Sequence, residues 1–162
     1  ENTATIKLYK LPSAEKREQL GLESHWFSYY KKWIPQDNYY YAQEHCGFEP
    51  NPNGRSEGTY SKYASLDDKT DGFHFYLQFI KFGFGRCTSE ASMEIRCGHI
   101  TRDEGVALVR KFDGEFPKRY FKDYLKYLDL TKSEFWQIVD KFRSPHLWKK
   151  VKGKWELKYQ VR

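Results

Sequence analysis

Two matching helix-start signals constrain the fold of this chain more than any other feature of its sequence. Thr101 is followed by Glu104, and Thr131 is followed by Glu134. In this Thr-x-x-Glu pattern, the capping box, each side chain accepts a hydrogen bond from the backbone N–H of the other residue and so fixes the first turn of a helix. The sequence therefore predicts a body that is mainly α-helical.

Further start and stop signals complete the expected element order. We expect helices from Ser13 to Gly21, from Pro35 to Gly47, from Ser65 to Gly83, from Ser89 to Cys97, from Thr101, after Pro117, and from Thr131 to Ser144-Pro145. The stretch from Trp26 to Trp33 is expected to be strand or coil, and the stretch from Glu49 to Arg55 is expected to be a loop rich in Pro and Asn. The tail from Val151 to Val161 alternates apolar and polar residues about Gly153, which favours a short β-hairpin or an edge strand. We accordingly divide the chain into a connecting segment at 1–57, a helical region at 58–150 and a tail at 151–162.

Composition narrows the class of protein and its partners. The 162 residues include 28 Lys and Arg against 22 Asp and Glu, and 19% are aromatic, so large side chains are available to form a core. No run of about 18 apolar residues occurs, so we expect no membrane-spanning helix. The excess of six positive charges is modest, which argues against a nucleic-acid partner. The three cysteines cannot all pair with one another, and we expect a reducing, cytoplasmic location.

The expected helix at 65–83 carries the first candidate site. Most of its residues are apolar, which predicts burial on most sides. Five polar residues recur at spacings of four, three, four and three and therefore share one face: Asp67, Asp71, His74, Gln78 and Lys81. This face is either the solvent side of an amphipathic helix or the wall of an active-site cleft, in which Asp71 and His74 form an acid/base pair.

A glycine-rich turn follows and is a second candidate. Gly83 and Gly85 lead through Arg86 to Thr88 and Ser89 at a helix start, where free backbone N–H groups and the positive end of the helix dipole favour an anion. The same residues also suit a plain linker with a Thr or Ser cap. The turn lacks the Gly-Lys-Ser/Thr ending of a P-loop, and the cysteines lack the spacing of a zinc site, so we expect no metal here.

Ordered motifs between Gly58 and Trp148 carry a family resemblance. They are Gly58 to Lys69, Asp71-Gly72-Phe73-His74-Phe75-Tyr76, Ile80-Lys81-Phe82-Gly83, Glu94-Ile95-Arg96, Gly98-His99-Ile100-Thr101-Arg102 and Phe142-Arg143-Ser144-Pro145-His146-Leu147-Trp148. This series resembles the C-terminal half of the N-acetyl sugar amidotransferases, enzymes that make bacterial surface polysaccharides such as lipopolysaccharide O-antigen, and flagellin glycans.

The resemblance implies a parent enzyme of the α/β PP-loop, adenine nucleotide alpha hydrolase-like type, of which this chain is the helical C-terminal part. It implies ATP-dependent conversion of a sugar acetamido group to an acetamidino group, with ammonia from a glutaminase partner. The family's Ser-Gly-Gly-Lys-Asp-Ser loop does not occur in this sequence. We therefore expect a fragment that is inactive alone, with ATP and Mg²⁺ bound mainly by an N-terminal half. The alternative is a non-catalytic helical module that binds a protein partner or an anionic polymer.

The resemblance and the polar face together select the candidate site residues. Catalytic roles are expected for Asp71, His74 and Lys81, with His74 as a proton acceptor and Lys81 in contact with a phosphate or a sugar carboxylate. Substrate or phosphate binding is expected for Asp67, Arg86, Thr88, Ser89, Glu94, Arg96, His99 and Arg102.

Overall fold

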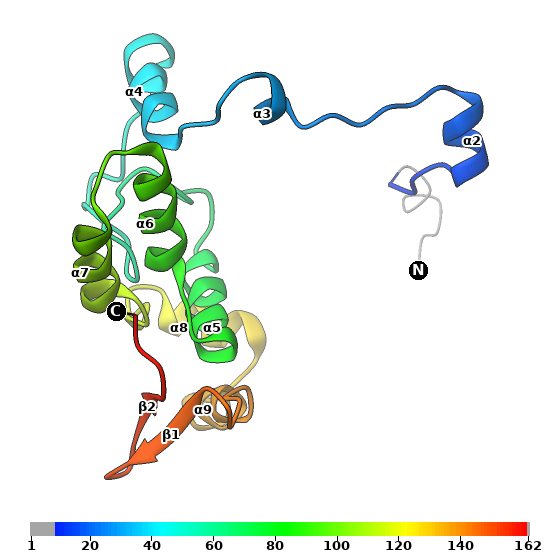
Figure 1. Cartoon of the computed structure of the whole chain (residues 1–162). Helices are drawn as coiled ribbons and strands as arrows, with labels where there is room; N and C mark the ends of the chain where they lie inside the picture. The colour runs from blue at the N-terminus through cyan, green and yellow to red at the C-terminus, as the bar shows by residue number, and fades with distance from the viewer. Residues whose placement is uncertain (1–8, 162) are drawn as a thin grey trace. The chain divides into compact units, whose positions relative to one another are not determined.

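The computed structural model describes residues 9–161, and the chain divides into two units between Asn38 and Tyr39. The described part of the first unit contains α2 (Ala14–Gln19), α3 (Phe27–Tyr30) and the start of α4 (Pro35–Cys46), which are traced in Figure 1. Ser13 caps α2 through a hydrogen bond from the Lys16 backbone N–H to the Ser13 hydroxyl of 3.3 Å, as the sequence predicts.

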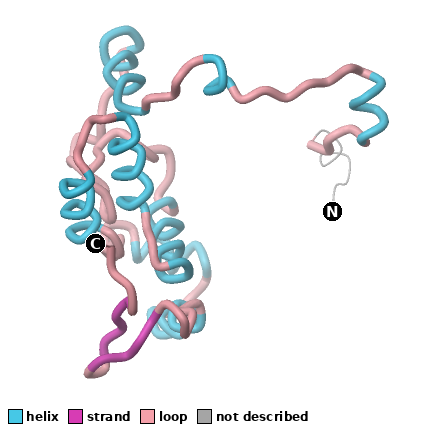
Figure 2. The backbone as a smooth tube through the Cα atoms, viewed as in Figure 1, coloured by secondary structure: helices cyan, strands magenta, loops and turns pink. Residues whose placement is uncertain are grey.

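The second unit is mainly helical, as the sequence predicts (Figure 2). After α4 come α5 (Asp71–Phe82), α6 (Arg86–Cys97), α7 (Arg102–Phe112), α8 (Phe121–Leu128) and α9 (Lys132–Lys141). The predicted hairpin is also confirmed: β1 (Trp148–Val151) pairs antiparallel with β2 (Lys154–Leu157), and Trp148 lies opposite Leu157. Both predicted capping boxes form, at the start of α7 and at the start of α9.

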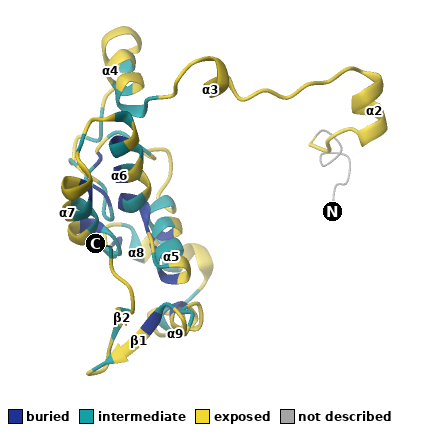
Figure 3. Ribbon diagram, viewed as in Figure 1, coloured by how far each residue is buried: buried dark blue, intermediate teal, exposed yellow. Residues whose placement is uncertain are grey.

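An aromatic core joins α5, α8, α9 and the hairpin. Phe73 is fully buried, and its ring stacks on Tyr124 with the ring centroids 3.9 Å apart. Trp148 fixes the hairpin to α5, because its indole N–H donates to the Ile80 carbonyl at 2.7 Å. Figure 3 shows buried residues gathered on α5, α6 and the start of β1. The members of this core cluster are Phe73, Tyr76, Ile80, Phe135, Val139 and Trp148.

Helices α6 and α7 pack side by side, and a glycine permits their close approach (Figure 1). A Cβ atom at Gly105 on α7 would lie 2.7 Å from the Ile95 Cδ1 atom and 3.7 Å from the Ala91 Cβ atom, both on α6. Ala91 itself is buried. The small residues at this crossing therefore set the spacing of the two helices.

Two predicted helix starts, those of α5 and α6, are wrong. The helix expected from Ser65 begins at Asp71, because Ser65 has a left-handed φ of 52° and the Asp68 carboxylate caps the helix later in the sequence. The helix expected from Ser89 begins at Arg86, whereas the helix expected after Pro117 does follow it, from Phe121.

Three other boundaries also differ from the sequence prediction. The segment expected to be strand or coil contains the single helical turn Phe27–Tyr30, closed by a hydrogen bond from the Lys31 N–H to the Phe27 carbonyl. Helix α9 ends at Lys141, three residues before Ser144. The hairpin starts at Trp148, upstream of the tail expected from Val151.

Candidate functional site

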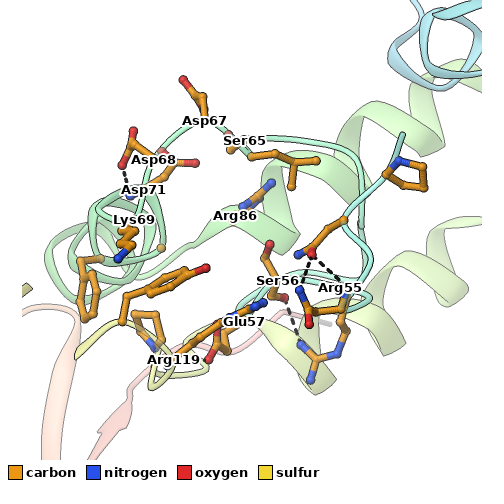
Figure 4. Close-up of a pocket in the computed structure, with 18 of the residues that line it drawn as sticks. Arg55, Ser56, Glu57, Ser65, Asp67, Asp68, Lys69, Asp71, Arg86 and Arg119 are labelled. Carbon is orange, nitrogen blue, oxygen red and sulfur yellow. Dashed lines mark hydrogen bonds between the residues drawn. The ribbon is translucent and has the colours of Figure 1, made fainter. Parts of the chain in front are cut away.

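A cleft in the second unit has a volume of about 760 Å³ and is lined mostly by polar side chains (Figure 4). Its walls come from the loop at 49–57, the loop at 65–70 with the first turn of α5, the first residue of α6 and the segment at 117–120. The lining residues are Glu49, Pro50, Asn51, Pro52, Asn53, Arg55, Ser56, Glu57, Ser65, Leu66, Asp67, Asp68, Lys69, Asp71, Gly72, Phe73, Arg86, Pro117, Arg119 and Tyr120.

The Pro/Asn loop forms one wall because an ion pair fixes it. The two terminal nitrogens of Arg55 donate to the two carboxylate oxygens of Glu115, at 2.6 and 3.0 Å, a bidentate arrangement of the stronger kind. Glu115 also accepts the Gly58 backbone N–H at 3.0 Å. The hydrogen bond from the Arg55 guanidinium holds the pKa of the Glu115 carboxyl below its ordinary value. The loop is thereby anchored to the connection between α7 and α8.

The opposite wall carries several acidic side chains, and they differ in their hydrogen-bond partners. Asp68 caps α5, accepting the backbone N–H groups of Thr70 at 2.6 Å and Asp71 at 2.9 Å, and its hydrogen bond from the Thr70 hydroxyl lowers the pKa of its carboxyl. Lys69 is engaged by Asp123 at 2.7 Å. Asp71 is different, because its Oδ2 atom is buried and has no hydrogen-bond partner among the described residues.

Arg86 lies between these two walls, as Figure 4 shows. Its side chain is only 4% exposed and is held on three sides. The Nε–H donates to Glu90 at 2.8 Å, Nη2 donates to the Ala64 carbonyl at 2.6 Å, and the guanidinium carbon lies 5.0 Å from the centroid of the Phe75 ring. Glu90 also accepts the hydroxyl proton of Thr59. The cleft therefore has a rigidly positioned cation at its floor.

The helix start that was expected to bind an anion is occupied by a carboxylate of the chain itself. Asp113 accepts the backbone N–H groups of Gly85 at 2.9 Å and Thr88 at 3.2 Å, and the Thr88 hydroxyl at 2.5 Å. The Ser89 hydroxyl turns back to the Gly85 carbonyl. An external phosphate therefore does not fit at this turn of α6, and of the expected trio only Arg86 lines the cleft.

His74 and Lys81 lie on a different surface from Asp71. Both line a smaller groove of about 480 Å³. Its other lining residues include Leu77 on α5, Phe84 in the turn after α5, Tyr124 on α8 and Phe142 just after α9. Asp71, the first residue of α5, lines the cleft, whereas His74 is exposed and lines the smaller groove. The expected acid/base pair of Asp71 and His74 is therefore not brought together.

The other predicted binding residues gather at the far end of α6. Glu94 and His99 form a close contact of 2.5 Å between a carboxylate oxygen and Nδ1, while Arg96 and Arg102 are exposed. Arg96 lies ten positions after Arg86 on α6, which is about 15 Å along the helix axis. The structure thus brings Asp67, Asp71 and Arg86 to one cleft and leaves Glu94, Arg96, His99 and Arg102 outside it.

Several residues that shape the cleft were missed by sequence reasoning. Arg55, Asp68, Lys69 and Arg119 line it, and Glu90 positions Arg86 from behind. The spacing of Arg86 and Glu90, four residues apart on a helix, is a signal from which this pair could have been predicted. Between residues 9 and 161, no group of three or more His, Cys, Asp or Glu side chains is arranged to hold a metal ion.

Comparison with known proteins places the chain in a family. The model of the family described as "LPS biosynthesis protein WbpG-like, C-terminal domain" matches residues 57–162, which include every residue that lines the cleft from Glu57 onward. No curated protein matches the chain. Within the described residues, no helix has the length and apolar content needed to cross a bilayer. The chain belongs to the WbpG-like family of lipopolysaccharide biosynthesis proteins, and it carries that family's C-terminal domain.

Proposed function

We propose that this chain is the sugar-binding part of an ATP-dependent N-acetyl sugar amidotransferase, and that its cleft holds a sugar that bears an acetamido group. The family membership gives the role in lipopolysaccharide biosynthesis. The motif series between Gly58 and Trp148, which resembles the amidotransferases, supports the more specific reaction. The polar cleft supports a sugar as the ligand, because sugars are bound through many hydroxyl and amide hydrogen bonds.

The observation that carries this proposal is the unpaired carboxylate oxygen of Asp71. Its Oδ2 atom is buried without a hydrogen-bond partner among the described residues, and Asp71 lines the cleft. A buried acceptor without a donor costs about 1–3 kcal/mol. The N–H of an acetamido group or a sugar hydroxyl would supply that donor, and binding would recover this free energy.

The reaction class assigns a limited task to this chain. In the proposed reaction, ATP activates the amide oxygen as an adenylate, and ammonia then displaces the adenylate to leave an acetamidino group. The residues described here offer no phosphate cradle at the α6 start, because Asp113 fills it. We therefore assign ATP and Mg²⁺ to an N-terminal PP-loop half, ammonia to a glutaminase, and the reaction to the cytoplasm. Residues of this chain bind the sugar and orient its acetamido group.

The test removes the charge of Asp71 and measures turnover. The chain is combined with its ATP-binding half and given ATP, Mg²⁺, ammonium and a diacetamido sugar, and mass spectrometry follows the exchange of one amide oxygen for an imino NH group. We expect Asp71→Asn to lower kcat/KM at least about tenfold, because an acceptor for the sugar is weakened. The melting temperature should stay close to that of the unchanged protein.

The matched control is Asp103→Asn. Asp103 is also in the first turn of a helix, α7, but it is exposed and lies outside the cleft. This control removes the same favourable charge near a helix N-terminus and should leave kcat/KM within about twofold. Equal kcat/KM for Asp71→Asn and the unchanged enzyme would overturn the proposal.

One observation favours the alternative, a non-catalytic binding module. The described part of the first unit exposes a run of large aromatic side chains, which are typical of protein interfaces: Trp26, Phe27, Tyr29, Tyr30 and Trp33. If this alternative holds, replacing these aromatics should abolish partner binding, while Asp71→Asn should change nothing.

A further inference from the structure

The floor of the cleft carries a guanidinium whose hydrogen-bonding capacity is only partly used. Arginine has five N–H donors, and Arg86 uses one of them on Glu90 and one on the Ala64 carbonyl. Among the described residues, no partner is found for its Nη1 atom. The side chain is only 4% exposed and yet lines the cleft, so its remaining N–H donors are available to a molecule that enters the cleft.

Stability alone does not account for this arrangement. Taking an ion pair out of water costs several kcal/mol per ion, which the mutual attraction only about repays, so a buried pair is weak support for a fold. Glu90 also shares its charge, because it accepts the hydroxyl proton of Thr59, and that hydroxyl oxygen in turn accepts the Ser61 N–H at 2.9 Å. This buried network holds the guanidinium in one orientation, with Phe75 beneath it.

Two other cations of the cleft are already engaged by carboxylates. Both terminal nitrogens of Arg55 donate hydrogen bonds to Glu115, and Lys69 forms an ion pair with Asp123. Arg119 lies with its guanidinium carbon 5.3 Å from the centroid of the Tyr120 ring, and it is exposed to solvent. Arg86 is therefore the cation of this cleft that is both buried and only partly paired.

The two sides of the cleft select for a ligand with two kinds of group. Asp67, Asp68 and Asp71 lie together on one side in Figure 4, and they repel an anion but accept hydrogen bonds from N–H and O–H groups. Arg86 lies on the floor, where a planar guanidinium matches the paired oxygens of a phosphate or a carboxylate. A neutral sugar satisfies only the acidic side.

We propose that Arg86 is the oxyanion-binding residue of the cleft, so that the sugar bound here carries a phosphate or carboxylate group which pairs with this guanidinium while its acetamido or hydroxyl donors face Asp71. The identity of the ligand as an acetamido sugar rests on the proposed function. A phosphate and a carboxylate both present an oxyanion to Arg86, and binding experiments with matched sugars distinguish the two groups.

The first experiment compares three probes on the full chain by calorimetry and NMR titration: N-acetylglucosamine, N-acetylglucosamine 1-phosphate and the uronic acid of N-acetylglucosamine. We expect at least one anionic probe to bind at least about tenfold more tightly than the neutral sugar. A preference for the sugar phosphate identifies a phosphate as the partner of Arg86, and a preference for the uronic acid identifies a carboxylate. The Nε–H resonance of Arg86 should shift with the preferred anion and not with the neutral sugar.

A second experiment uses a double variant that removes the positive charge of Arg86 and, with it, the negative charge of its partner Glu90. Arg86→Gln combined with Glu90→Gln keeps the site neutral, and it should reduce the preference for the anion to about twofold or less. The control Arg110→Gln removes an exposed arginine on α7, outside the cleft, and should keep the full preference. If the double variant does not fold, the three-probe comparison and the Arg86 resonance still decide the matter.

The failure of this inference is distinct from the failure of the proposed function. Equal affinity for all three probes, with resonance shifts in the cleft, would overturn the role of Arg86 and leave the sugar site standing. No binding of any of the three probes would overturn both.

Discussion

At the scale of single residues, Arg55 and Glu115 show how an ion pair far apart in the sequence determines the shape of the cleft. The pair joins the Pro/Asn loop to the α7–α8 connection, and both side chains are only partly exposed. Glu115 also binds the Gly58 N–H, so its carboxylate holds the loop by three hydrogen bonds. Loss of its charge should therefore loosen one wall of the cleft.

This pair predicts a specific acid sensitivity. The hydrogen bond from Arg55 lowers the pKa of Glu115 from its ordinary value of 4.5, so the native state binds this proton less readily than the unfolded state does. The stabilisation is present above pH 4.5 and is lost as the pH falls through the lowered native pKa. Urea unfolding from about pH 6 to about pH 3 should show a smaller loss of stability for Glu115→Gln than for the unchanged chain. Parallel acid limbs for the two proteins would contradict this role.

Sequence reasoning could identify a residue of the cleft only where a nearby sequence motif pointed to it. Asp71 and Arg86 stand in motifs that sequence reasoning selected, and the structure places both in the cleft. The partner expected for Asp71 was His74, but the start of α5 turns the two side chains to different surfaces. Arg55 could not be predicted, because its partner lies 60 positions away.

At the scale of elements, α6 illustrates a helix whose start is fixed from a distance. Its N-cap residue, Gly85, has no side chain with which to cap, and Asp113 supplies the carboxylate instead. A Cβ atom at Gly85 would lie 2.8 Å from the Asp113 Oδ1 atom, so the glycine makes room for this cap. Since Arg86 is the first residue of α6, this cap also positions the floor of the cleft.

Asp113→Ala should therefore destabilise the fold and disturb the cleft together. Loss of a helix cap costs about 0.5–2 kcal/mol, and here the hydroxyl of Thr88 also loses its acceptor. Thermal unfolding measures the first effect, and the Arg86 Nε–H resonance reports the second. Thr101→Ala, which removes the cap of α7, is the control: it should lower stability by a similar amount without moving the Arg86 resonance. A resonance unchanged in both variants would show that the cap does not position Arg86.

The same contrast explains which elements the sequence predicts correctly. The starts of α7 and α9 are right because their caps are encoded three residues away, at Glu104 and Glu134. The start of α6 is displaced because its cap comes from 28 residues downstream of Gly85. The start of α5 is displaced because the left-handed φ of Ser65 cannot be inferred from the residue type.

At the scale of the whole molecule, the mainly helical fold with its C-terminal hairpin follows from periodicity and from start and stop signals. All residues of the cleft belong to the second unit, and most lie within the region matched by the family model. The cleft itself could not be predicted, because it requires the loop at 49–57 to meet the loop at 65–70 across the start of α6. These contacts depend on Arg55, Glu115 and Asp113 rather than on any continuous motif.

The most direct test of the sugar site locates the acetamido methyl group of a bound sugar. Intermolecular NOEs would be measured between this methyl group and the full chain, with an N-acetylated sugar phosphate as the probe. If the sugar binds in the cleft, we expect NOEs to Pro117 and Tyr120, two residues with apolar surface that line the cleft together with Asp71. NOEs confined to the groove around Leu77 and Phe84, or to the exposed aromatics before Trp33, would contradict it.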